Sequence, residues 1–184
     1  MRIGHASIDE NNRTKNGRAG DQTGKEVCIR TYYDKNWDYV LRPNTSDLAE
    51  RSAKACESMC NNPCIGYDQN ERNSLISYLE RLNWQYVSIK ADTECDCSSF
   101  MTACALCAGA KIAYRGNAPT TRTMVARFRE SGAYDIIRFV SPKHSNLKRG
   151  DILVKEGSHT VMVLDNYQST INTTKDTKPT LNTD

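Results

Sequence analysis

The sequence is poor in several features that would assign a protein to a class at once. It has 184 residues, a net charge of only +3, three histidines, three phenylalanines and two tryptophans. The near-balance of charge gives no electrostatic reason to expect a nucleic acid partner. No stretch approaches the roughly 20 apolar residues of a membrane span, and the N-terminus lacks the charged-then-apolar pattern of a secretory signal. We therefore expect a globular protein made in a cytoplasm, with no membrane insertion.

Cysteine, in contrast, is abundant, and without a secretory signal we expect most of the eight cysteines to be reduced and buried. Three groups have spacings that could suit zinc: Cys56, Cys60 and Cys64; Cys95 and Cys97; Cys104 and Cys107. Pro63 is expected to end the first group's helix before Cys64, and no histidine pair or second, separated CxxC completes a zinc pattern. We predict no metal and no other cofactor, although a non-enzymatic zinc or redox module remains the alternative from another class.

The apolar patterning predicts an α+β domain over residues 1–166, followed by a linker or tail over 167–184. We expect strands near residues 2–8, 26–33, 37–42, 135–140, 151–155 and 159–166, and helices over 44–60, 70–84, 97–110 and 121–132. The unbroken apolar run from Val161 to Leu164 is typical of a central strand covered on both faces. Asp47 and Glu50 are expected to cap the first helix. Asp21 and Gln22 are expected to form a turn, although a place in a substrate groove is also open.

The strongest chemical signal is the segment ECDCSSFMTACALCAG, in which Cys97 opens a helix directly after Asp96. A helix N-terminus stabilises negative charge, so the pattern predicts a lowered pKa for the Cys97 thiol. A cysteine nucleophile also needs a base, usually histidine. His159 begins the predicted core strand and can face the helix start across a sheet. Each residue alone is more often structural, but together they predict a catalytic pair. His144 is expected to be exposed and inert.

These motifs resemble the NlpC-type papain-like cysteine hydrolases of peptidoglycan, in their phage lysin branch. The resemblance runs from about Ile65 to Asn166 and rests on DCSS, LKRGDILV and SHTVMVLD, with Ser158 replacing the usual glycine. It implies a papain-like fold, with a central antiparallel sheet packed against helices. IGYDQNER resembles the segment that places a tyrosine beside the nucleophile. The resemblance therefore implies that Tyr67 assists the oxyanion or the substrate, a role in which Asp96 could share if it is more than a cap.

The resemblance also implies a role for the N-terminal residues that contain His5. In the family a third polar residue, often histidine, orients the base from the strand that follows it, yet only the polar tail follows Asn166. IGHAS near the N-terminus is similar to that third-residue strand, and TYYDKNWDYVLRP resembles the family's closing strand. We expect a circular permutation in which residues 1–42 supply strands usually found last, ahead of helices and core strands in 43–166. His5 would then hydrogen-bond His159, with Asp165 and Asn166 as distant fallback candidates.

The resemblance implies a phage endolysin that cuts an amide bond of the peptidoglycan stem peptide. The activity that the resemblance implies is that of a D-glutamyl–diamino acid endopeptidase or an N-acetylmuramoyl-L-alanine amidase. It also implies action on the cell wall after release from the host cytoplasm. The threonine-rich tail suits a connection to a wall-binding domain. A papain-like acyltransferase or effector stays open, because one fold hosts many reactions.

Overall fold

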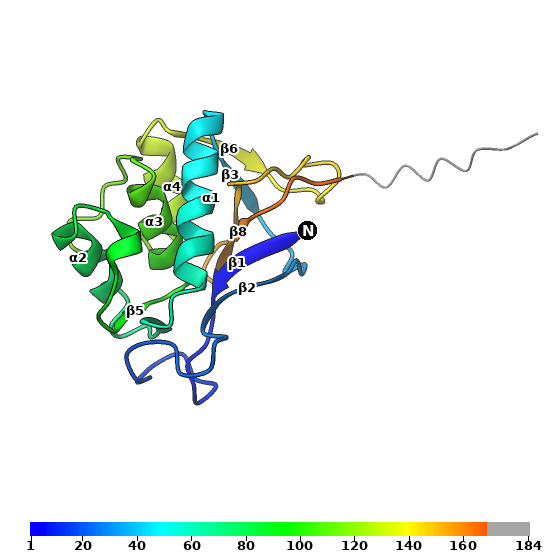
Figure 1. Ribbon diagram of the computed structural model, residues 1–184. Helices are drawn as coiled ribbons and strands as arrows, with labels where there is room; N and C mark the ends of the chain where they lie inside the picture. Colours follow the sequence, from blue (N-terminus) through cyan, green and yellow to red (C-terminus); the bar gives the residue numbers. More distant parts are fainter. Residues whose placement is uncertain (169–184) are drawn as a thin grey trace, which may run out of the picture.

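A six-stranded antiparallel sheet forms the centre of the computed structural model, which describes residues 1–168 (Figure 1). Its strands are β1 (Arg2–Ala6), β2 (Val27–Thr31), β3 (Tyr39–Pro43), β6 (Tyr134–Arg138), β7 (Ile152–Lys155) and β8 (His159–Val163). Their order is β2-β1-β8-β7-β3-β6, so the N-terminal strand lies beside the last strand in the chain. The predicted α+β class and central antiparallel sheet are confirmed.

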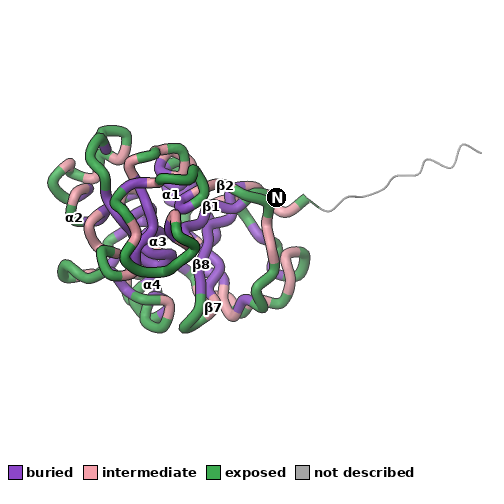
Figure 2. The backbone as a smooth tube through the Cα atoms, turned by 90° about the horizontal axis from the view of Figure 1, so that it is seen from below, coloured by how far each residue is buried: buried purple, intermediate pink, exposed green. Residues whose placement is uncertain are grey.

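Four α-helices lie together on one side of this sheet, as Figure 1 shows. They are α1 (Ser46–Cys60), α2 (Ser74–Arg81), α3 (Cys97–Cys107) and α4 (Met124–Glu130), with a short 3-10 helix η1 at Tyr86–Ser88. Helix α3 runs through the middle of the molecule and packs against α1, α2 and β8 (Figure 2). Its alanine, serine and cysteine side chains are small, so neighbouring elements approach it closely on every side.

Two cores form, one on each face of the sheet. The larger lies between sheet and helices and includes Phe100, Phe128 and Met162. The smaller covers the opposite face, where Trp37 and Leu147 pack on Ile3, Val40 and Leu153, together with Val161 and Val163. All five residues of β8 are buried. The prediction of a central strand covered on both faces is therefore confirmed.

Two very short strands were not predicted from the sequence. Strands β4 (Ile65–Tyr67) and β5 (Thr93–Cys95) pair in parallel as a separate two-stranded sheet. Three residues are too few to show an alternating pattern, which explains why the apolar periodicity missed them. The pairing sets Tyr67 opposite Cys95, two residues before Cys97, and so brings the end of β4 to the start of α3.

The helix ends differ from expectation for identifiable reasons. Thr45, not the predicted pair of Asp47 and Glu50, caps α1, and its side chain accepts a bond from the Leu48 N–H. Those two acidic residues instead form ion pairs with arginines. Helix α3 stops at Cys107, before the predicted end, and Gly109 follows with a φ of 95°, a conformation that favours glycine.

None of the helices in residues 1–168 has the length and apolar character that a membrane crossing requires. The predicted linker begins at Tyr167, whose N–H bonds the Leu147 carbonyl. From residue 169 onward the predicted tail, and any wall-binding domain attached to it, lies outside the described residues.

Candidate active site

Cys97 is the first residue of α3 and is held there by a reciprocal cap. The Asp96 carboxylate accepts a bond from the Ser99 N–H at 2.7 Å, and the Ser99 hydroxyl accepts one from the Asp96 N–H at 2.9 Å. Arg72 donates to the same carboxylate at 2.6 Å and to the carbonyl of Pro119. Asp96 is thus engaged as helix cap and ion-pair partner, and its role is to fix the start of α3.

The Cys97 thiol does not have the lowered pKa that its helix position predicts. The residue is only 6% exposed, and burial, followed by the charge of Asp96, raises its pKa to about 12. The N–H groups of Thr160 and Ser98 oppose this rise but do not overcome it. Desolvation of the thiolate therefore outweighs the helix dipole. Because Thr160 follows His159 directly, its contact with the sulfur brings Cys97 to the first residues of β8.

His159 is linked to His5 by the hydroxyl of Tyr33. This hydroxyl lies 2.8 Å from Nε2 of His159 and 3.1 Å from Nδ1 of His5, while the two imidazole rings are 6.0 Å apart. The sequence predicts a direct bond between the histidines, and the structure instead places Tyr33 between them. Strand pairing explains the arrangement, since β1 lies between β8 and β2, and the residues just after β2 turn back over the two histidines.

Both histidines are held in their neutral form. Burial, followed by the charge of His5, lowers the pKa of His159 to about 3, and burial with the charge of Arg30 lowers that of His5 to about 4. Burial also raises the pKa of Tyr33 to about 12. At neutral pH the site therefore holds an uncharged thiol, two neutral imidazoles and a protonated phenol. These four groups can donate or accept a proton, but no two of them form an ion pair at neutral pH.

Trp37 and Tyr33 are functional candidates that the sequence reasoning missed. The Trp37 ring stacks on His159 with centroids 6.2 Å apart and an interplanar angle of 27°, and it is 4% exposed. The aromatic-rich segment TYYDKNW was visible, but its pattern assigns only strand and turn. Its spacing cannot say which ring reaches His159, since that depends on how the connector after β2 folds back.

Tyr67, which the resemblance assigns to the oxyanion or the substrate, ends β4. It is 3% exposed, and its hydroxyl accepts a bond from the Gln69 amide at 3.2 Å. Burial, followed by the charge of Cys97, raises its pKa. The hydroxyl therefore remains protonated and can donate a hydrogen bond.

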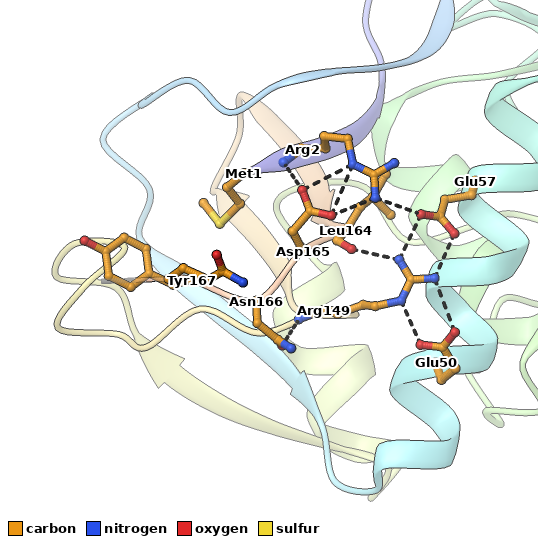
Figure 3. Close-up of a pocket in the computed structure, with 10 residues that line it drawn as sticks. Met1, Arg2, Glu50, Glu57, Arg149, Leu164, Asp165, Asn166 and Tyr167 are labelled. Carbon is orange, nitrogen blue, oxygen red and sulfur yellow. Dashed lines mark hydrogen bonds and ion pairs between the residues drawn. The ribbon is translucent and has the colours of Figure 1, made fainter. Parts of the chain in front are cut away.

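Asp165 and Asn166 follow the end of β8 that is opposite to His159, and their side chains bond other residues (Figure 3). Asp165 pairs with Arg2 at 2.7 Å, and the Asn166 side chain accepts a bond from the Arg149 N–H. Arg149 itself joins α1 to the end of β8 through Glu50, Glu57 and the Leu164 carbonyl. None of these groups meets His159.

Two further predictions can be read directly. His144 is exposed and bonds the Ser141 hydroxyl at 2.8 Å, as expected of an inert surface histidine. The Asp21 carboxylate accepts bonds from the N–H groups of Thr23 and Gly24, which confirms its expected turn role.

A group of carboxylates lies behind Tyr67, where the loop of residues 7–26 covers β4 and β5. Glu94 is 3% exposed, and neither carboxylate oxygen has a hydrogen-bond partner among residues 1–168. Burial, followed by the charges of Glu26 and Asp68, raises the pKa of Glu94 to about 8. Glu26 accepts bonds from the N–H groups of Gln22 and Tyr67, and so ties this loop to β4. Glu94 is therefore protonated at neutral pH.

All eight cysteines are free thiols. Within residues 1–168 no group of three or more His, Cys, Asp or Glu side chains is arranged to hold a metal ion. Cys56 and Cys104 instead contact each other between α1 and α3, where this contact, and after it burial, raises the pKa of Cys56. These thiols pack the interior of the helical layer.

Comparison with known proteins gives one match. Searches of curated proteins and of solved structures find no significant similarity to this chain. The family model described as "Endolysin-like domain" matches residues 3–170. The matched range contains Cys97, His159, Tyr33 and His5. The match to this family supports a cell-wall-lytic role with peptidoglycan as the substrate. The chain belongs to the endolysin-like domain family.

Proposed function

We propose that the protein is a cysteine hydrolase of peptidoglycan, with Cys97 as nucleophile and His159 as its base. The observation that carries the proposal is the hydrogen-bonded chain His159–Tyr33–His5 together with Cys97 at a capped helix N-terminus, whose sulfur contacts the N–H of Thr160, the residue after His159. A nucleophile, a base and an oriented third group are the parts that thiol catalysis requires. Here the third position is shared, since Tyr33 touches the base and His5 acts through Tyr33.

We assign to the hydrogen bonds along this chain the direction that leaves Nδ1 of His159 free to act as a base. His5 can accept the Tyr33 proton at Nδ1, which leaves the phenol oxygen free to accept a proton from Nε2 of His159. With Nε2 protonated, a neutral His159 has its free lone pair on Nδ1. Nδ1 is then the atom that takes the Cys97 proton. Tyr33 and His5 are positioning residues that hold the required tautomer.

The mechanism starts from an uncharged pair. When the substrate carbonyl arrives, Nδ1 of His159 takes the thiol proton as the Cys97 sulfur attacks the carbonyl carbon. The Cys97 N–H at the helix start and the Tyr67 hydroxyl stabilise the oxyanion that develops. The amine then leaves with the proton from His159, and a thioester remains. His159 next takes a proton from water, the hydroxide attacks the thioester, and the acid product and free thiol form.

The substrate we propose is the stem peptide, cut at the D-glutamyl–diamino acid bond or at the muramoyl–L-alanine bond. Both are amides, and the same groups serve both reactions. We further propose that the fold is NlpC-type papain-like and circularly permuted. Support comes from the antiparallel pairing of β1 with β8, because this pairing sets the strand of His5 beside the strand of His159.

Mass spectrometry of digested peptidoglycan tests the proposal. Wild-type protein is compared with Cys97→Ala and with Cys107→Ala, which removes another thiol of the same helix, at its far end. We expect new fragments from the wild type and from Cys107→Ala, and none from Cys97→Ala, while circular dichroism shows all three folded. The new termini identify the bond. Fragments from Cys97→Ala would refute the assignment of the nucleophile.

A further inference from the structure

Two cations near the candidate base, Arg30 and Lys35, form no ion pair within residues 1–168. Arg30 lies on β2, the edge strand of the sheet, and Lys35 lies in the connector between Tyr33 and Trp37. Both are exposed. Most arginines that contact the site or the sheet are paired, as Arg72 and Arg149 are.

Arg30 is held in a defined position. Its guanidinium carbon lies 5.0 Å from the centre of the Tyr33 ring, the same ring whose hydroxyl bonds His159. In the register of β1 and β2, Arg30 pairs with Ile3 and Cys28 pairs with His5, so Arg30 lies on the same face as His5. The cation–π contact leaves the N–H donors at the edge of the guanidinium free to bind a ligand.

The charges of Arg30 and Lys35 affect the candidate base, His159. The charges of Lys35 and Arg30 both lower the pKa of His159, after burial and His5. The one acidic residue between them, Asp34, uses an oxygen to accept the Asn36 N–H, and its charge raises the pKa of Tyr32. On this side of the site two positive charges stand against the one negative charge of Asp34, which leaves it net positive next to the base.

We infer that Arg30, assisted by Lys35, binds a substrate carboxylate that lies on the residue supplying the scissile carbonyl or on a residue up to two positions away. This inference rests on the proposed function and specifies the substrate class, a stem peptide with a free α-carboxylate on its D-glutamyl residue. Guanidinium groups bind carboxylates through paired N–H donors, and an extended peptide advances about 3.3 Å per residue. A carboxamide at the same position accepts fewer bonds and carries no charge, so amidated stem peptides are poorer substrates.

The test uses two synthetic stem peptides that differ only in having a D-glutamyl α-carboxylate or α-carboxamide. kcat/KM is measured for the wild type, Arg30→Gln and Arg138→Gln. Arg138 is the matched control, since it lies 5.1 Å over Tyr39 in the same kind of contact but on β6, the opposite edge of the sheet. We expect the wild type and Arg138→Gln to prefer the carboxylate about tenfold, and Arg30→Gln to lose that preference. Added salt should narrow the preference.

The outcomes separate the two proposals. If Arg30→Gln lowers kcat/KM equally for both peptides, Arg30 only supports Tyr33, and the inference is wrong. A wild type that cuts both peptides equally would also overturn the inference while leaving the hydrolase intact. If the wild type cuts neither peptide, nor purified peptidoglycan, the proposed function fails and this inference fails with it.

Discussion

Replacement of Glu94 by Gln should stabilise the protein, and the gain should increase with pH. Glu94 is buried without a hydrogen-bond partner, and its pKa rises to about 8 from an ordinary value of 4.5. Between these two values the folded protein holds a proton that the unfolded chain has released. The stability that this proton provides is complete below pH 4.5 and is lost as the pH rises through 8. A glutamine side chain is uncharged at every pH and has nearly the same shape as a protonated glutamate.

The magnitude follows from the two pKa values. Each pH unit between them changes the free energy of unfolding by about 1.4 kcal/mol. From pH 5 to pH 8 the wild type should therefore lose about 4 kcal/mol relative to Glu94→Gln. Such a loss is a large share of the 5–15 kcal/mol that is typical of a folded domain. The pKa of Glu26 is also raised, by burial first, and the charge of Glu26 is in turn one cause of the raised pKa of Glu94.

Urea unfolding at several pH values measures this difference. The wild type, Glu94→Gln and Glu130→Gln are unfolded at pH 5, 6, 7 and 8, and the free energies are subtracted at each pH, so that titrations common to all variants cancel. Glu130 is a suitable control because its side chain is 59% exposed on α4. The difference for Glu94→Gln should rise steadily with pH, and that for Glu130→Gln should stay flat. Equal slopes for the two variants would refute a buried, protonated Glu94.

Three other predictions concern the candidate site and its support. Tyr33→Phe should lower kcat about tenfold or more while the protein stays folded, because His159 loses the group that fixes its tautomer; an unchanged kcat would exclude that role. The pKa of His159 is lowered to about 3, so the base form persists as the pH falls, and kcat/KM should keep its value below pH 6; a loss centred near pH 6.5 would contradict the burial of this imidazole. Arg149→Ala should reduce stability by about 1–2 kcal/mol in thermal unfolding without changing the cleaved bond, since Arg149 joins α1 to β8 far from Cys97.

Local patterns in the sequence predict the class of fold and the candidate nucleophile and base. Apolar periodicity is a local property, so the six strands of the main sheet and the four helices could be predicted to within a few residues at their ends, while β4 and β5 were too short to show it. The small residues of α3 and the run of β8 predicted burial, and both are buried. Cys97 and His159 were identifiable because each follows a local motif: an Asp-Cys helix start and a histidine that opens a core strand.

The surroundings of these residues depend on contacts between distant segments. The hydroxyl of Tyr33 meets His159 in a sheet where β1 lies between β8 and β2, and the local pattern of TYYDKNW does not predict that contact. Protonation states also depend on burial. The helix N-terminus alone predicts a lowered pKa for Cys97, whereas the packing around α3 raises it to about 12. Nothing in the sequence distinguishes Glu94 from other glutamates. Its pKa rises to about 8 because the fold buries it.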